Sequence, residues 1–509
     1  MPKVRYQDFS GGMQNATSRF LQRDNELTLA LNVHGDKIGA IKKRLGFKRS
    51  GGEVTTDKSP SVVYDGGTYN YTHLDIAIKH NDAGTWTPTT GGTAPTASML
   101  VSMQRFPEIG KLYIGGATKA PTSAAHFLVT QVVADEAGTP ETKINAGGTD
   151  GQTSDDGSFP RAKFITRWRD RLYFGYCYGA FYDATEIKSN RVVYSHTPTG
   201  GLLTSQQVSD VRILLNDADF NNFFDTDDPI TGMVGTADAL VVWTANSMWK
   251  WTSTSWKNRY SIGCMSHRSI QQVDVYTLWL SREGIYVESG NKPELISNKI
   301  QPIIDAIPDM TETFSWKDES HYYLWVGTLT LDGVSYTNCV IQYSVKSNSF
   351  YLYSYTLPTG KVITAGGVFE SAGVTRPYIG TSTGEIFQIS HPGDATPVYT
   401  DGDQTSETYP IEMKVQTKRY DMGVPEENKT ITKMTVISEY AAGTTVRTST
   451  EKGDWYTAGD IQKPIDLITI NPPKGKDLKI EFSQTGTTEG PEIESIIMDV
   501  NQTSKEHDA

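Results

Sequence analysis

Between residues 60 and 395, short strands of alternating aromatic and aliphatic residues recur, each followed by a glycine or polar turn and a second such strand. Clear copies are residues 111–115 (KLYIG), 171–175 (RLYFG), 322–327 (YYLWVG) and 377–380 (PYIG). Repeated hairpins over so long a stretch predict radial repetition of small sheets, because a closed circle leaves only short, protected sheet edges. The copies are unevenly spaced, by roughly forty to seventy residues, so we expect an irregular six- or seven-bladed β-propeller with insertions.

The composition favours an all-β fold. Aromatic residues make up 10% of the chain, with 26 Tyr and 10 Trp, and there are 46 Gly. This balance is typical of strands and turns. The three cysteines, Cys177, Cys264 and Cys339, are far apart and form no CxxC pair, so they indicate neither a disulfide framework nor a zinc site. We expect no cofactor and no metal.

The chain divides into four expected parts. They are an extended N-terminal arm (1–55), the propeller (56–402, with its largest insertion at 134–158), a C-terminal β-sandwich (408–502) and a flexible tail (503–509). The polar run 401–408 (DGDQTSET) predicts a linker before the sandwich. After it, six alternating strands are expected between residues 411 and 500.

One helix is expected inside the propeller. Ser297 or Asn298 would cap it and Pro302 would stand in its first turn. Its apolar face would be Ile300, Ile303, Ile304 and Ile307, which follow the helical spacing. No run of eighteen apolar residues occurs, so no membrane-spanning segment is expected.

The first fifty residues differ in charge from the rest. They hold ten Lys or Arg and four Asp or Glu, whereas the whole chain has a net charge of −12. Large apolar residues are scattered in this segment, so we expect it to need another surface to become ordered. We expect a basic arm that docks on an acidic neighbour. A solvated basic loop is the alternative.

The opening segment carries several short motifs in order. They are FSGG (9–12), DNE (24–26), NV (32–33) and G-x-x-x-K-R-x-G-F (39–47). This order resembles the opening segment of the β-propeller proteins that form the nozzle, or DNA-stabilising hub, of short-tailed bacteriophages. Within it, the expected assembly residues are Phe9, Gly11, Gly12, Asn32, Lys43 and Arg44.

The resemblance implies a structural virion protein made in the host cytoplasm and located in the tail. In that family the protein forms a homo-oligomeric ring, a hexamer, which retains genomic DNA and lets it pass at ejection without sequence-specific binding. The implied partners are tail adaptor or portal-side proteins and tail fibres. Because the chain outside the first fifty residues is strongly acidic, we expect the wall of the DNA channel to be acidic or neutral.

An acidic segment is the candidate channel or gate loop. It contains Asp217, Asp219, Asp225, Asp227 and Asp228. The spacing partly matches a calcium-binding EF-hand loop, but Asn222 stands where the sharp turn needs glycine and Asp228 where a glutamate is expected. The alternative to a gate loop and to a calcium site is an ordinary loop that leads into the next blade.

The sequence contains no catalytic motif that we can identify, so we expect no enzyme. It lacks GxSxG, HExxH, a Walker A lysine and a GxGxxG after a strand. A virion-associated glycan-binding or glycan-hydrolysing propeller remains the alternative function, and hydrolysis would need two convergent carboxylates. A basic cluster, Arg161 to Arg171, could contact phosphates, although an exposed strand face explains it as well.

Overall fold

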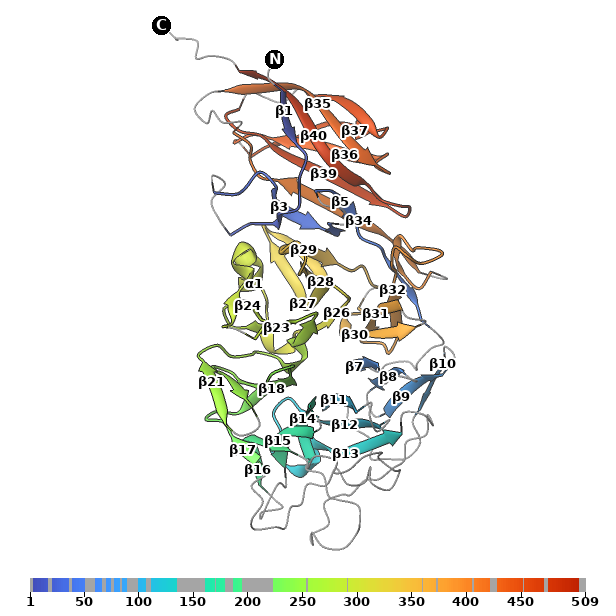
Figure 1. Cartoon of the computed structure of the whole chain (residues 1–509). Helices are drawn as coiled ribbons and strands as arrows, with labels where there is room; N and C mark the ends of the chain where they lie inside the picture. The colour runs from blue at the N-terminus through green and yellow to red at the C-terminus, as the bar shows by residue number, and fades with distance from the viewer. Residues whose placement is uncertain are drawn as a thin grey trace, which may run out of the picture.

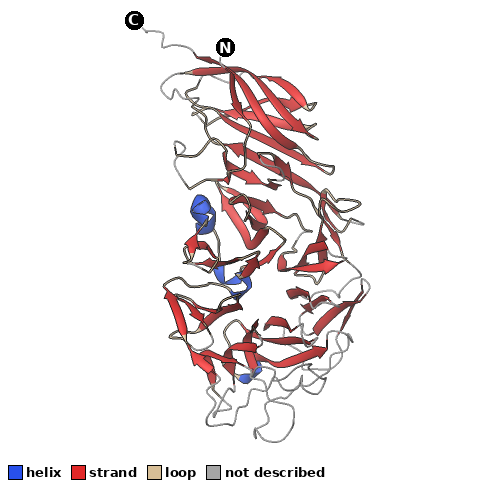
Figure 2. Cartoon of the chain, in the orientation of Figure 1, coloured by secondary structure: helices blue, strands red, loops and turns tan. Residues whose placement is uncertain are grey.

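The computed structural model of the chain is built almost wholly from β-strands (Figures 1 and 2). Among the described residues, α1 (Gln301–Asp305) is the only α-helix. The expected all-β class is confirmed. The structure describes residues 3–502 except 17–20, 36–38, 51–59, 66–69, 75–76, 83–84, 89–98, 107–110, 135–160, 170, 179–185, 195–222, 253–254, 291, 359, 372–373, 405–406, 422–427, 452 and 471–474.

A propeller-like circle of small antiparallel sheets occupies the lower part of Figure 1. The first sheet consists of β7 (Pro60–Asp65), β8 (Asn70–Leu74), β9 (Ala77–Asp82) and β10 (Thr85–Pro88). The second consists of β11 (Met99–Phe106), β12 (Lys111–Thr118) and β13 (Phe127–Ala134). The third consists of β14 (Arg161–Trp168), β15 (Arg171–Tyr178), β16 (Ile187–Tyr194) and β17 (Phe223–Asp225). The next two are β18 (Ile230–Gly235), β19 (Leu240–Thr244), β20 (Met248–Trp251) and β21 (Trp256–Tyr260); and β22 (Gln271–Val273), β23 (Tyr276–Ser281), β24 (Gly284–Glu288) and β25 (Glu294–Leu295).

Two further groups of strands complete the circle. They are β26 (Phe314–Lys317), β27 (His321–Leu331), β28 (Val334–Ser344) and β29 (Ser349–Ser354); and β30 (Ile363–Ser371), β31 (Val374–Thr381), β32 (Ile386–Ile389) and β6 (Phe47–Arg49). The first strands of neighbouring groups contact one another, as in β11 with β14 and β26 with β30. The circle closes because β30 also contacts β7.

Aromatic side chains fill the spaces between neighbouring sheets of the circle. The fully buried rings of Trp243 in β19 and Trp279 in β23 lie with their centroids 5.2 Å apart. Phe224 of β17 stacks on Trp251 of β20 at 4.4 Å. Each such pair removes a large apolar area from water and joins two sheets. The aromatic strands visible in the sequence are therefore the contacts that hold the circle together.

The expected helix is present, although short. It consists of a 3₁₀ turn (Ser297–Ile300) followed by α1, with Pro302 near its start. Its isoleucines belong to the main hydrophobic core, and Ile300, Ile303 and Ile304 are fully buried. The prediction of an isoleucine face packed on the sheets is confirmed.

The upper part of Figure 1 is a β-sandwich. One sheet contains β38 (Ile465–Thr469), β35 (Lys429–Glu439), β40 (Glu492–Gln502), β5 (Ile41–Lys43) and β4 (Val33–His34), and β1 (Lys3–Tyr6) also pairs with β40. The other contains β3 (Glu26–Leu31), β34 (Thr408–Thr417), β39 (Lys479–Gly486), β36 (Thr444–Ser449) and β37 (Trp455–Ile461), with β2 (Gly12–Met13) and β33 (Thr400–Gly402) at its side. All six strands expected between residues 411 and 500 occur, and β37 is an additional one.

The expectation of an N-terminal arm that needs another subunit to bury it is wrong. Strands β1 and β5 pair with β40, and β3 lies between β29 and β34. Strand β6 pairs with β32 and so becomes the outer strand of the last group of the circle. The segment reads as polar along the chain, but its apolar residues fall at positions that face the core: Phe9, Leu27, Leu31, Val33, Ile41 and Phe47 are all buried.

The interpretation of residues 401–408 as a linker is also incomplete. Asp401 is fully buried in β33, and β34 already begins at Thr408. The tail (503–509) and nearly all of the insertion (134–158) lie outside the described residues. No described helix is long and apolar enough to cross a membrane.

Candidate functional site

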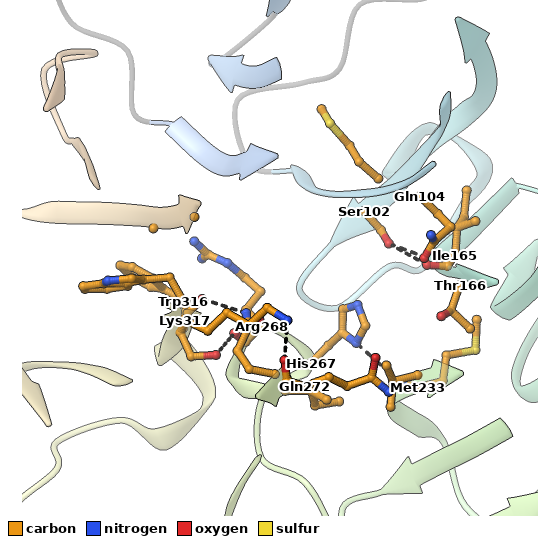
Figure 3. Close-up of a pocket in the computed structure, with 18 of the residues that line it drawn as sticks. Ser102, Gln104, Ile165, Thr166, Met233, His267, Arg268, Gln272, Trp316 and Lys317 are labelled. Atoms are coloured by element: carbon orange, nitrogen blue, oxygen red, sulfur yellow. Dashed lines mark hydrogen bonds between the residues drawn. The ribbon is translucent and has the colours of Figure 1, made fainter. Parts of the chain in front are cut away.

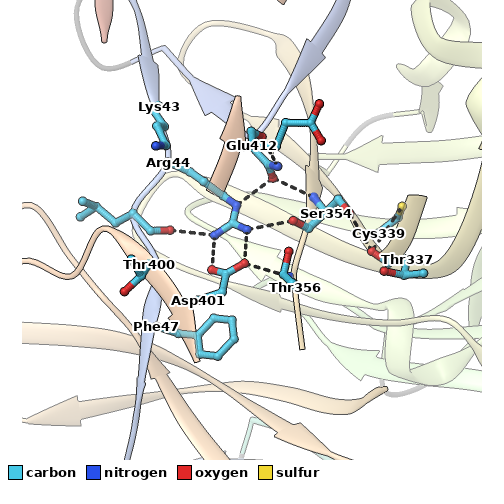
Figure 4. Close-up of polar contacts among 12 residues, drawn as sticks. Lys43, Arg44, Phe47, Thr337, Cys339, Ser354, Thr356, Thr400, Asp401 and Glu412 are labelled. Carbon is cyan, nitrogen blue, oxygen red and sulfur yellow. Dashed lines mark hydrogen bonds and ion pairs between the residues drawn. The ribbon is translucent and has the colours of Figure 1, made fainter. Parts of the chain in front are cut away.

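Arg44 lies where the N-terminal strands, the circle of sheets and the sandwich meet (Figure 4). Its guanidinium donates to the two carboxylate oxygens of Asp401 at 2.8 and 2.6 Å. Nη2 also donates to the carbonyl oxygen of Ser354 in β29 at 2.9 Å. The side chains of Arg44 and Asp401 are only 3% and 0% exposed. Taking both charges out of water is costly, and the full set of hydrogen bonds made by both partners offsets this cost.

Asn32 holds the other side of the guanidinium. Its backbone has a φ of 55°, a left-handed conformation that asparagine tolerates better than most residues. Its Oδ1 accepts from Arg44 Nε and from the Ser354 N–H, both at 2.8 Å. Its Nδ2 donates to the carbonyl oxygen of Glu412 at 2.6 Å. One buried amide therefore connects β29 with the sandwich strand β34.

The ion pair is further fixed by its surroundings. The Thr356 N–H donates to the Asp401 carboxylate at 2.8 Å, and the Arg44 guanidinium lies 4.3 Å from the centre of the Tyr355 ring. Burial alone would lower the pKa of Arg44, but the adjacent Asp401 carboxylate raises it above its usual value. We call Arg44, Asp401 and Asn32, with their hydrogen-bond partners, the Arg44 joint.

The remaining expected assembly residues also lie inside the chain. Phe9 is buried, and Lys43 donates to the carbonyl oxygen of Gly486 at 3.0 Å, while burial lowers its pKa to about 8. Gly12 has a φ of 65°, a backbone conformation that favours glycine, and a Cβ at this position would lie 2.6 Å from the Cβ of Ser349. A Cβ on Gly11 would lie 2.7 Å from the Asn25 carbonyl oxygen, so neither position has room for a side chain. These residues serve internal packing, so the expectation that they dock on a neighbour is corrected.

Two of the three described aspartates in the acidic segment, Asp225 and Asp227, are paired with arginines. Asp225, in the outer strand β17, accepts two hydrogen bonds from Arg191 at 2.8 and 2.9 Å. Asp227 lies 2.7 Å from Arg259. Asp228 lies in the loop between β17 and β18, where its carbonyl oxygen accepts from the Thr226 hydroxyl. Asp217 and Asp219 lie outside the described residues, and no metal-binding cluster occurs among the residues the structure describes.

The basic cluster is largely engaged in structural contacts. Arg161 donates to the Ala124 carbonyl oxygen at 3.1 Å and Lys163 to that of Lys119 at 2.7 Å. Arg167 donates to the carbonyl oxygen of Arg169 at 3.0 Å. Burial, reinforced by the charge of Lys119, lowers the pKa of Lys163 to about 8. These contacts favour the strand-face interpretation over a surface for phosphates.

A cavity of about 480 Å³ lies at the centre of the circle of sheets (Figure 3). Residues of β11, β14, β18, β22, β26 and β30 line it. Its volume is that of a small-molecule pocket, far too small to admit a DNA duplex.

The described residues of the cavity wall include basic side chains but no carboxylate. Arg268 donates to the Thr364 carbonyl oxygen at 2.6 Å and Lys317 to that of Gln272. Burial lowers the pKa of Arg268 to about 10 and that of Lys317 below its usual value. It lowers the pKa of His267 to about 4, so this imidazole is neutral at pH 7. Nothing in the sequence marks these residues, because closing the circle is what brings them together.

No protein-family profile matches this chain, and no curated protein matches it. Among solved structures, the GH74 xyloglucanase from Xanthomonas campestris is 9% identical over 66% of this chain and 44% of its own, with a TM-score of 0.40. The extracellular domain of a hybrid two component system from B. thetaiotaomicron is 11% identical over 91% of this chain and 60% of its own, with a TM-score of 0.42. The designed protein Ika8 covers 67% of this chain and 99% of its own at 10% identity and a TM-score of 0.35. Similarities this low indicate nothing about function.

Proposed function

We propose that this protein is a structural subunit of the ring at the distal end of a short bacteriophage tail, the nozzle or DNA-stabilising hub. The observation that carries the proposal is the Arg44 joint. Asn32, Arg44 and Gly46 belong to the motifs that resemble this family, and each has a defined place in the joint or beside it. A Cβ on Gly46 would lie 1.8 Å from the Thr400 carbonyl oxygen, so the motif meets a requirement of this architecture.

We further propose that the circle of sheets is a seven-bladed β-propeller. The groups that begin with β7, β11, β14, β18, β22 and β26 would be the first six blades. The seventh would be β30 to β32 with β6. Because β6 comes from the N-terminal segment, hydrogen bonds between the two ends of the propeller would secure its closure.

The Arg44 joint suits a subunit whose two parts, the circle of sheets and the sandwich, must stay fixed relative to each other. Strand β3 pairs with β29 on one side and with β34 on the other, so one backbone segment ties the propeller-like circle to the sandwich. The buried Arg44 pair adds side-chain links at the same place. In this proposal the protein acts in the virion tail between adaptor or portal-side proteins and tail fibres, and genomic DNA passes between subunits.

The first prediction concerns assembly. The purified full chain is expected to form closed rings, hexamers in the related family, because the proposed DNA passage exists only between subunits. Negative-stain class averages would show the ring, and light scattering would give a mass that is a multiple of 56.2 kDa. Monomers alone at every concentration, with and without duplex DNA, would contradict the proposal.

The second prediction concerns DNA. The protein is expected to bind duplex DNA no tighter than roughly 10⁻⁴ to 10⁻⁶ M at physiological salt, the range of non-specific binding. The physical reason is its net charge of −12 and the internal use of Arg161 and Lys163. Fluorescence anisotropy with a labelled duplex measures this. The opposite outcome would be nanomolar, salt-sensitive binding that is lost in Arg167→Gln and Arg169→Gln. It would show that the basic cluster binds DNA.

A further inference from the structure

A second pocket, of about 690 Å³, lies beside the Arg44 joint. Three distant parts of the chain line it: the N-terminal segment with Ser10 and His34, the strands β27 to β29 with the turns beside them, and residues 389–392 at the end of β32 and after it. Its volume falls within the range of pockets that bind small ligands. We call it the tyrosine pocket, because its wall includes Tyr323, Tyr351, Tyr353 and Tyr355.

An oriented histidine stands in this wall. Nδ1 of His321 lies 2.8 Å from one oxygen of Asp318, and the Tyr323 hydroxyl donates to the other oxygen at 2.8 Å. Burial would raise the pKa of Asp318, but the hydrogen bonds that it accepts, first from His321 and then from the Ser320 N–H and the Tyr323 hydroxyl, outweigh burial and hold this pKa below its usual value. In the neutral imidazole, with Nδ1–H directed at the carboxylate, Nε2 is a hydrogen-bond acceptor.

Gln342 adds hydrogen-bond donors to the same wall. Its Oε1 accepts from the Tyr353 hydroxyl at 2.7 Å, which fixes the amide. The residue is only 2% exposed, and its Nε2 has no hydrogen-bond partner among the described residues. An amide nitrogen at the wall of a pocket can donate to water or to a ligand oxygen. The pocket therefore offers an unused donor close to aromatic rings.

The charges of the pocket nearly balance. Arg44 is neutralised by Asp401, and the described lining adds one lysine, Lys346 at the exposed rim, and one carboxylate, Asp318, which is bonded to His321. The pocket thus favours a ligand that is neutral, has hydroxyl groups that both donate and accept, and has apolar faces for aromatic rings. Asp318 is the only carboxylate among the described lining residues, whereas glycoside hydrolysis uses a pair.

We propose that the tyrosine pocket binds a short neutral saccharide without cleaving it. The neutral His321 accepts a hydrogen bond from one sugar hydroxyl and Gln342 donates to another, while the partly exposed ring of Tyr323 packs against the sugar ring. This site is independent of the proposed role in a phage tail. It would give the subunit a means of contacting a glycan, whatever assembly it belongs to.

The experiment uses the labelled full chain on an array of neutral and acidic glycans, followed by calorimetry with the soluble glycan that binds. Saturable binding to a neutral glycan is expected. His321→Ala and Gln342→Leu should each weaken it by at least about tenfold, the loss of one good hydrogen bond to a partner left unpaired. Lys346→Gln is the matched control at the same rim, and it should leave the affinity for a neutral glycan unchanged.

Melting curves show whether each variant is folded. Ser347→Trp, a substitution at an exposed rim position, blocks the pocket without touching the core and should also abolish binding. Three results would overturn the proposal: no neutral glycan bound by the wild-type chain, binding that survives both wall variants and the blocking variant, or binding only to acidic glycans that Lys346→Gln abolishes. The last would identify an anion site instead. Release of free sugar during the assay would show hydrolysis and contradict binding without cleavage.

Discussion

A chain that lacks residues 1–50 is expected to lose its native fold, rather than to stay folded and fail only in assembly. The deletion removes β1, β3, β5 and β6, which pair with β40, β34 and β32 in both parts of the molecule. It uncovers core residues of β34 such as Met413 and Val415 and leaves Asp401 buried without its arginine. Exposed apolar sheets of this kind aggregate readily.

Circular dichroism during heating, together with limited proteolysis, would test this expectation. The truncated chain should show no cooperative transition like that of the full chain, and it should be digested quickly. Adding a separate peptide of residues 1–50 during refolding is the control, since it should restore part of the transition. A truncated chain that melts as the full chain does would mean that the segment is a detachable arm after all.

Asp401→Ala is expected to lower the free energy of unfolding by about 3–5 kcal/mol, because it leaves the Arg44 charge buried and unpaired. Arg44→Ala should have an effect of similar size, since it leaves the buried Asp401 carboxylate without its charged partner and removes the hydrogen bonds to Asn32 and Ser354. Denaturation by urea, followed by intrinsic fluorescence, measures both.

Arg259→Ala is the matched control for these variants. Arg259 also forms an ion pair, with Asp227, but the two side chains are 53% and 60% exposed. Exposed pairs of this kind contribute about 0–1 kcal/mol. Should Asp401→Ala prove no more harmful than Arg259→Ala, the Arg44 joint would not be what holds the two parts together.

Local patterns in the sequence predicted much of the secondary structure. The aromatic alternation located strands such as β12, β15 and β27, because residues on a strand face opposite sides in turn and large rings seek burial. The isoleucine spacing located the helix at α1, because apolar residues that repeat about every 3.6 positions lie on one face of a helix and that face seeks burial. Strand β37 was missed because several of its residues are exposed and carry no apolar alternation.

The N-terminal segment shows where prediction from local sequence patterns fails. The motifs of the sequence mark Asn32, Lys43 and Arg44 as important, but they suggest partners on another subunit. The actual partners, such as Asp401 and the Gly486 carbonyl oxygen, lie more than three hundred residues away in the same chain. Asp401 itself looked like the start of a linker, because a buried carboxylate is recognisable only once its arginine is placed.

The amino-acid sequence by itself determined that the chain forms strands and which residues of each strand seek burial, since both depend on neighbours a few positions apart. Only the tertiary structure decided that the first strands complete both the sandwich and the circle of sheets. It also decided where cavities open. The tyrosine pocket joins Ser10, His321 and His391, and the central cavity joins Gln104, Arg268 and Lys317. Such groupings depend on contacts between residues far apart in the chain, which no local pattern records.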